Sequence, residues 1–192
     1  MKNIYLLITL LLVSFSSCKT IKPVAEITPK ASQPQVPVTA VSPPAVNFSD
    51  QSTWLLGYFS PGQLTREPYS TWYYTGYDDY QPNSDALNKL FNIDKSGLSM
   101  KIVMGTWCPD SRREVPRFMR ILDIWKFPVS MVTFIGVDMA KFSPVGEYDK
   151  LDIQRVPTFI IYKNNIEAGR IIENPKTSLE QDLVNILSGN EQ

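Results

Sequence analysis

The part of this chain that most constrains its fold is an apolar run followed at once by a helical pattern. Residues 98–104, LSMKIVM, form a run of strand length that stops at Gly105. Residues 109–126 then carry apolar side chains at helical spacing, with arginines between them. Residues 131–137, MVTFIGV, are a second apolar run of strand length. Because a helix would connect the two runs, we expect parallel strands in one sheet with this helix packed against it.

The C-terminal part predicts a hairpin and a last helix. Residues 158–162 and 166–172 read as two strands, and the asparagines between them tolerate the positive φ angles of a tight turn. Thr177 and Glu180 fit a capping box, so we expect a helix to begin at Thr177. The predicted fold class is therefore α/β, with a central mixed β-sheet flanked by α-helices.

The segment before the first predicted strand is rich in aromatic residues. Trp and Tyr recur over residues 54–80, and the apolar spacing of residues 84–91 predicts a helix. Aromatic rings most often fill cores and cover edges, so we expect most of these rings to be buried. A groove for a peptide or a sugar is the alternative role for them. We place the folded domain at residues 48–192.

Composition excludes several classes of function. The chain has 192 residues, equal numbers of acidic and basic side chains, and a formal net charge of zero. Without a basic surface we expect no nucleic-acid partner. The sequence has no histidine, which removes histidine-based proton transfer and the commonest metal ligand. We expect no metal and no cofactor, and we expect one domain, given the length.

The N-terminal residues indicate export and a lipid anchor. Residues 1–18 comprise a basic start, an apolar run and the sequence Ser16-Ser17-Cys18, which resembles the lipobox of bacterial lipoproteins. An ordinary signal peptide with an incidental Cys18 is the alternative. Residues 19–47 are rich in proline, and we expect a disordered stalk. The predicted location is the cell envelope, lipid-anchored and facing the periplasm.

Four motifs in this order resemble the thioredoxin family. Trp107-Cys108 follows a predicted strand and opens a predicted helix, and Pro116 lies eight residues after the cysteine. Val156-Pro157-Thr158 precedes the next strand, as the cis-proline segment of the family does. Residues 159–165, FIIYKNN, resemble the strand and turn that follow. The resemblance covers residues 97–189 and implies the thioredoxin fold.

The resemblance also implies a site. A cis Pro157 would face Cys108, and the Val156 backbone would pair with an incoming substrate chain, although a trans proline in an ordinary loop is the alternative. The implied catalytic residues are Cys108 and Ser111. The implied substrate-binding residues are Trp107, Pro109, Val156, Pro157 and Thr158.

Two positions depart from the family pattern. Ser111 stands where a resolving cysteine is expected, and Ile102 stands where the family has a buried aspartate that takes a proton during resolution. Cys108 at the start of a helix would receive the partial positive charge that favours its thiolate form. Ser111 could donate a hydrogen bond to that thiolate. A mixed disulfide on Cys108 therefore needs a second thiol from outside the site.

Three functions remain open from the sequence. Cys108 could exchange disulfides with protein or low-molecular-weight thiols, and an external or substrate thiol would release it. The domain could instead bind unfolded or cysteine-containing clients without redox chemistry. Cys108 could also form an intermolecular disulfide, for example with a second copy, in a structural role. The first function is the one we expect, as a monothiol oxidoreductase or isomerase.

Overall fold

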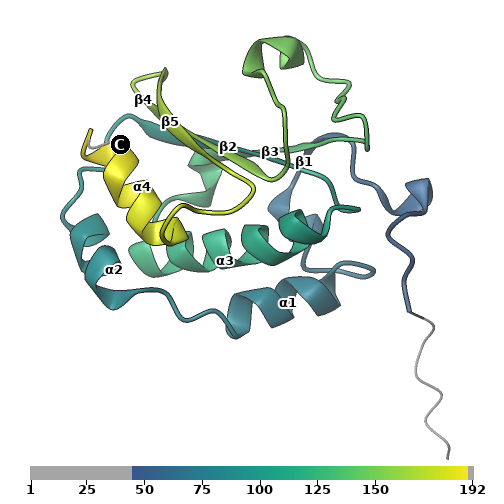
Figure 1. Ribbon diagram of the computed structural model, residues 1–192, viewed down its shortest axis with the longest axis horizontal. Coiled ribbons are helices and arrows are strands. Elements are labelled where there is room, and N and C mark those ends of the chain that lie inside the picture. Colours follow the sequence, from purple (N-terminus) through teal and green to yellow (C-terminus); the bar gives the residue numbers. More distant parts are fainter. Residues whose placement is uncertain (1–44, 190–192) are drawn as a thin grey trace, which may run out of the picture. The chain divides into compact units, whose positions relative to one another are not determined.

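The computed structural model describes residues 45–189. The predicted signal peptide, Cys18 and the predicted linker up to residue 44 lie outside the described residues. Within residues 45–189 the fold is mixed α/β, with a five-stranded mixed sheet flanked by helices (Figure 1). No helix among these residues is both long and apolar enough to cross a membrane.

The sheet has the strand order β1-β3-β2-β4-β5. The strands are β1 (Gly57–Phe59), β2 (Leu98–Met104), β3 (Val132–Gly136), β4 (Thr158–Lys163) and β5 (Ile166–Ile172). The α-helices are α1 (Ser70–Asp78), α2 (Ser84–Phe91), α3 (Pro109–Trp125) and α4 (Leu179–Leu187), and four short 3-10 helices, η1 to η4, complete the described elements.

The predicted strand pairing around the central helix is confirmed. β2 and β3 pair in parallel, with Ile102 opposite Phe134, and α3 connects them. β4 pairs antiparallel with β2, and β5 pairs antiparallel with β4. The hairpin turn consists of Asn164 and Asn165, whose φ angles are 51° and 64°. The two asparagines thus adopt the left-handed conformation that a two-residue turn requires.

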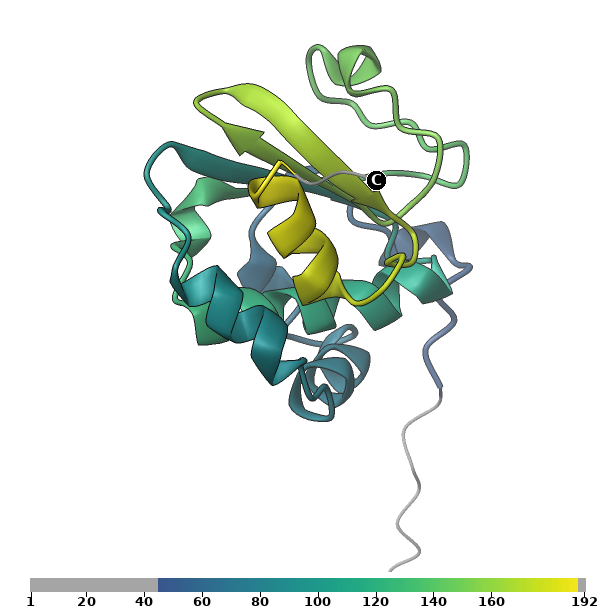
Figure 2. The ribbon, with the colours of Figure 1, turned by 60° about the vertical axis from the view of Figure 1, so that its left-hand side comes forward.

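The two faces of the sheet are covered differently. All four α-helices lie on one face, where α3 packs against the sheet and α1 lies on the outer side of α3 (Figures 1 and 2). Residues 138–156, which include the 3-10 helix η4 (Tyr148–Leu151), cover the other face. The core is divided accordingly into a large cluster under the α-helices and a small one under residues 138–156, and Cys108 belongs to the small cluster.

The aromatic segment contributes a helix that the sequence did not predict. Residues Ser70–Asp78 form α1, in which Tyr73 is buried, and Tyr69 just before it is buried as well. The expectation of buried rings is thus confirmed for these two tyrosines, whereas Tyr58 and Tyr74 are exposed. Gly76 lies against the Pro116 ring of α3, so a side chain there would collide with that ring.

The start of the last helix differs from the predicted capping box. Ser178 is the N-cap of α4, and its side chain accepts a hydrogen bond from Gln181 N. Thr177 instead donates its hydroxyl to the buried Asp182 at 2.6 Å. The carboxylate of Glu180 accepts a hydrogen bond from the Tyr80 hydroxyl at 2.8 Å, which ties α4 to the segment after α1. The predicted cap was therefore wrong by one residue, because Thr177 bonds to the nearby Asp182 of α4 and Glu180 bonds to the distant Tyr80.

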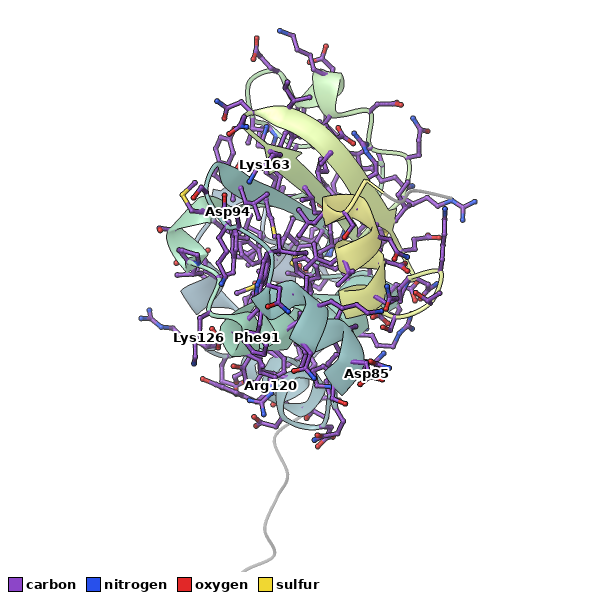
Figure 3. The ribbon with its side chains drawn as sticks, turned by 90° about the vertical axis from the view of Figure 1, so that its left-hand side faces the viewer. Asp85, Phe91, Asp94, Arg120, Lys126 and Lys163 are labelled. Atoms are coloured by element: carbon purple, nitrogen blue, oxygen red, sulfur yellow. The ribbon has the colours of Figure 1, made fainter. Side chains whose placement is uncertain are left out.

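A salt bridge fixes the end of the sheet far from the β2–α3 connection. Lys163, at the end of β4, lies 3.8 Å from the Asp94 carboxylate in the loop before β2 (Figure 3). The same ammonium group donates to the Ser96 carbonyl at 2.6 Å. These contacts hold the loop before β2 against the β4–β5 turn.

Candidate functional site

The candidate site begins where β2 ends and α3 starts. Cys108 is the N-cap residue of α3, and its extended backbone has φ −79° and ψ 122°. Its N–H donates to the Gly105 carbonyl at 3.0 Å, which closes the turn between strand and helix. Pro109 occupies the first helical position, where a missing N–H costs no hydrogen bond. The turn therefore places the Cys108 side chain at the positive end of a 17-residue helix.

The sulfur of Cys108 faces the segment before β4. Its Sγ lies 3.3 Å from the Val156 carbonyl oxygen and donates a hydrogen bond to it. The peptide bond between Val156 and Pro157 is cis. Only 6% of Cys108 is exposed. The structure thus brings Cys108 together with the segment that the sequence assigned to its site.

Val156, Pro157 and Thr158 are all buried and make hydrogen bonds within the domain. The Pro157 carbonyl accepts a hydrogen bond from Glu173 N at 2.7 Å, and the Thr158 hydroxyl donates to the Arg155 carbonyl at 2.6 Å. Pairing of an incoming chain with Val156 would therefore require a backbone segment that is buried in this structure.

Ser111 has a different partner from the one expected. It is completely buried, and its Oγ accepts a hydrogen bond from Gly105 N at 3.3 Å. No hydrogen bond joins it to Cys108 among the described residues, since the Cys108 Sγ bonds to Val156. This buried hydrogen bond stabilises the turn between β2 and α3. We correct the expectation that its hydroxyl donates to the sulfur.

Trp107 is held in place on the other side of the cysteine. Its Nε1 donates to the Val137 carbonyl at 2.9 Å. Its ring lies against Gly105, where a Cβ would come within 2.4 Å of the indole. Trp54 contacts it with 6.5 Å between ring centroids. The indole nitrogen is therefore satisfied by the protein itself, and the partly buried ring forms a wall of the site.

Arg112 stabilises the same turn with a charged group. Its Nη1 donates to the carbonyl oxygens of Thr106 and Trp107, at 3.0 and 2.9 Å. The guanidinium also lies over the ring of Phe48, 4.7 Å from its centroid. Burial lowers the pKa of Arg112, and the negative charge of an ionised Cys108 acts in the opposite direction. A cation thus lies one helical turn from the sulfur.

The N-terminal segment of the domain closes over this turn. Thr106 is buried, its hydroxyl donates to the Thr53 carbonyl at 2.9 Å, and it accepts from Leu55 N at 3.4 Å. Gly136 at the end of β3 lies directly under the Leu55 carbonyl, because a Cβ there would be 2.0 Å from that oxygen. We call residues 47–56 the N-terminal strap. No pattern in the sequence indicates these contacts, of which the Thr106 hydrogen bonds join residues 51 and 53 positions apart.

The donor set does not suggest a metal centre. Among residues 45–189 no three side chains of cysteine, aspartate or glutamate converge on a point that could hold an ion. Cys108 is the free cysteine of this part of the chain. The chemistry available at the site is therefore that of one sulfur, backbone amides and a nearby guanidinium.

Comparisons with known proteins add no assignment. No protein-family model and no curated protein matches the chain. Among solved structures, one match is a protein of unknown function from Pseudomonas aeruginosa, with 12% identity and a TM-score of 0.43, covering 62% of this chain and 80% of that one. Another is an HIV epitope scaffold, with 13% identity and a TM-score of 0.40, covering 63% and 73%. At these TM-scores the alignments do not establish a common fold.

Proposed function

We propose that this chain is a thioredoxin-like protein with the thioredoxin fold that exchanges thiols and disulfides through the single sulfur of Cys108. The observation that carries the proposal is the position of that sulfur. It lies at the N-terminus of α3 and 3.3 Å from the Val156 carbonyl, at the edge of β4. The order of strands and helices, β1-β3-β2-β4-β5 with α3 between β2 and β3, supports the fold assignment.

The proposed reaction needs one protein sulfur and two steps. The Cys108 thiolate attacks one sulfur of a substrate disulfide, an S–S bond forms, and the other substrate sulfur leaves as a thiolate that takes up a proton. A second thiol, from the substrate or from a small molecule, then loses its proton and attacks the mixed disulfide. Cys108 is released as a thiolate. The protein undergoes no net redox change, so isomerisation and removal of small-thiol adducts both fit.

Positive charge surrounds the position of the attacking sulfur. Unpaired backbone N–H groups and the dipole of α3 place partial positive charge at Cys108. Arg112 adds a full positive charge one turn away, fixed by its bonds to Thr106 and Trp107. The carboxylate of Asp110 would oppose this effect, but it pairs with Arg113 at 2.7 Å. Positive charge from the helix and from Arg112 therefore lies close to the sulfur that has to attack.

The surroundings of Ser111 and Ile102 support a mechanism without internal resolution. Ile102 is buried in the large core under the α-helices, where a carboxylate would have no partner. Ser111 is engaged with Gly105 N and contributes no sulfur. A mixed disulfide on Cys108 is therefore long-lived until an external thiol arrives.

The burial of Cys108 favours a second candidate function. With 6% of the residue exposed and the thiol bonded to Val156, the domain could bind clients without reacting with them. The two functions differ in what they require of the sulfur. Exchange requires Cys108, whereas a redox-inactive binding module does not.

One experiment separates these functions. The full chain with Cys18→Ala carries Cys108 as its single thiol and is given a peptide whose cysteine is blocked as a mixed disulfide with 2-mercaptoethanol. Exchange predicts that the blocking group is removed in the presence of excess 2-mercaptoethanol faster than by 2-mercaptoethanol alone, and that Cys108→Ala abolishes the acceleration. Equal rates with and without the protein, with peptide binding retained in Cys108→Ala, would instead support the binding module.

We further propose that the protein is exported to the cell envelope and anchored by lipid on Cys18. The sequence before Cys18 supports this, as does the proline-rich segment up to residue 47. Cells labelled with a palmitate analogue should incorporate it into the chain, and Cys18→Ala should prevent incorporation. Labelling that persists in Cys18→Ala would contradict the anchor.

A further inference from the structure

A pocket between α1 and α3 lies beside the cysteine turn, but the chemistry of Cys108 does not require it. Its volume is about 430 Å³, within the ~300–1,000 Å³ usual for small-molecule sites. Residues from α1 and from the segment after it form one wall, and the first turns of α3 form the other. Its side chains include Trp72, Asp79, Tyr80, Arg112, Arg113 and Arg117.

The pocket walls are rich in hydrogen-bond donors without acceptors. In both Arg112 and Arg117, Nη1 is the atom that donates the side-chain hydrogen bonds. Among residues 45–189, their Nε and Nη2 groups donate to no protein atom. Trp72 Nε1 is buried and likewise has no partner in this part of the chain. A buried donor without a partner, such as Trp72 Nε1, is rare in proteins, whereas the arginine donors are not fully buried and can reach a ligand.

The guanidinium groups are held in position by the protein. Buried Glu114 accepts hydrogen bonds from Arg113 at 2.6 Å and from Arg117 at 3.1 Å. Arg117 also lies over the Tyr80 ring, 5.5 Å from its centroid. The side chains of Arg113 and Arg117 remain 40% and 36% exposed. Arg113 is occupied by Glu114, Asp110 and Asn174, whereas the free donors of Arg117 are fixed in direction yet open to a ligand.

The nature of the walls indicates the class of ligand. Fixed arginine donors bind oxyanions in preference to neutral groups. The rings of Trp72 and Tyr80 provide apolar surface beside these donors. Asp79 is the one carboxylate among the lining residues, and Glu114, which pairs with Arg113 and Arg117, also offsets part of the arginine charge. A ligand with a carboxylate at one end and an apolar or ring-bearing body matches this arrangement.

We propose that this pocket binds a small organic carboxylate, with the carboxylate on Arg117 and Arg112 and the apolar body against Trp72 and Tyr80. Arg112 belongs both to the pocket and to the Cys108 site, because its Nη1 donates hydrogen bonds to the Thr106 and Trp107 carbonyls. A bound carboxylate would therefore contact a residue that positions the turn of Cys108. The binding itself does not depend on exchange at the sulfur.

The test compares N-benzoylglycine with its neutral amide, N-benzoylglycinamide, by isothermal titration calorimetry on the full chain carrying Cys108→Ala. We expect the carboxylate to bind about tenfold more tightly than the amide, because charge-assisted hydrogen bonds are lost in the amide. Arg117→Gln should remove this difference, whereas Arg66→Gln, on the exposed loop before α1, should leave it unchanged. Asp79→Asn should tighten binding of the carboxylate about two- to threefold.

Several outcomes would overturn the proposal. Equal affinity for the carboxylate and the amide would exclude recognition of the charge. A weaker affinity in Asp79→Asn would place the carboxylate elsewhere, and this variant tests the proposal even if Arg117→Gln does not fold. Inorganic phosphate that binds as tightly as N-benzoylglycine would show a general oxyanion site and exclude the assigned ligand class. Because every arm uses Cys108→Ala, failure here leaves the proposed exchange function untouched.

Discussion

The thiol of Cys108 donates a hydrogen bond to the backbone carbonyl of Val156 at 3.3 Å, across 48 residues of sequence. This contact joins the start of α3 to the segment that enters β4, and it sets the direction of the sulfur. The same carbonyl repels an anionic sulfur, so ionisation of Cys108 should release this contact. Release would free the sulfur from its backbone partner before it attacks a disulfide.

Thr106 is expected to be the main link between the N-terminal strap and the cysteine turn. Its hydroxyl bonds to Thr53 and Leu55 while the residue is buried. Thr106→Val keeps the shape but leaves these two backbone groups without their partner, which should cost about 1–3 kcal/mol of unfolding free energy. Urea denaturation measures the loss. Thr133→Val, on the half-buried middle of β3, is the matched control and should change stability little.

Arg112 is expected to raise the reactivity of Cys108. Removing its charge in Arg112→Gln should slow alkylation by iodoacetamide at pH 7 about two- to fivefold, since an exposed or half-buried ion pair contributes ~0.5–1 kcal/mol. The rates are followed by loss of free thiol in the Cys18→Ala background. Arg66→Gln should react at the wild-type rate. Faster alkylation in Arg112→Gln would show that the side chain mainly shields the sulfur.

The close approach of the strap to β3 makes Gly136 sensitive to any side chain. In Gly136→Ala the new methyl group would meet the Leu55 carbonyl at 2.0 Å, so the strap must move away. We expect a loss of about 1–3 kcal/mol, as for overpacked interiors. Gly146→Ala is the control, because no atom lies within 4 Å of its Cβ position. Equal stability of the two variants would contradict the packing of the strap.

Alkaline pH should destabilise the fold through its buried tyrosines. Burial raises the pKa of Tyr148 to about 12, whereas an unfolded tyrosine ionises at ~10. The folded state keeps its proton at pH values where the unfolded state loses it. This stability is complete below pH ~10 and is lost as the pH rises toward about 12. The urea midpoint should fall over this range.

Tyr148→Phe tests the origin of that pH dependence. The variant loses the hydrogen bond to the Lys141 carbonyl, so it should be less stable at neutral pH. Its urea midpoint should nevertheless decline less steeply above pH 10. Some slope should remain, because burial also raises the pKa of Tyr73. An unchanged slope would assign the alkaline loss to other groups.

Local patterns in the sequence predicted the elements around the site, because their signals are short-range. The run before Gly105 and the helical spacing after Cys108 specify β2 and α3, and the asparagine pair specifies the hairpin turn. α1 was missed because its aromatic residues show little helical periodicity. Tertiary packing, such as that of Gly76 on Pro116, stabilises this helix against α3.

The details that depend on distant contacts could not be predicted. Thr177 and Glu180 match a capping box in sequence, but the distant Tyr80 takes the Glu180 carboxylate, and Thr177 bonds locally to Asp182. Ser111 faces Gly105 and not the sulfur, since the turn of the chain directs it inward. The strap contacts of Thr106 likewise depend on the path of the chain across the sheet, which no local pattern records.

The central claim is that the sulfur of Cys108 in the folded protein attacks disulfides and that the chain cannot resolve the product. The most direct measurement incubates the folded Cys18→Ala chain with 2-hydroxyethyl disulfide and follows the intact protein by mass spectrometry. We predict one stable mercaptoethanol adduct per chain, absent in Cys108→Ala and removed by added thiol. Modification of Cys108 only after the chain is unfolded in urea would contradict the claim.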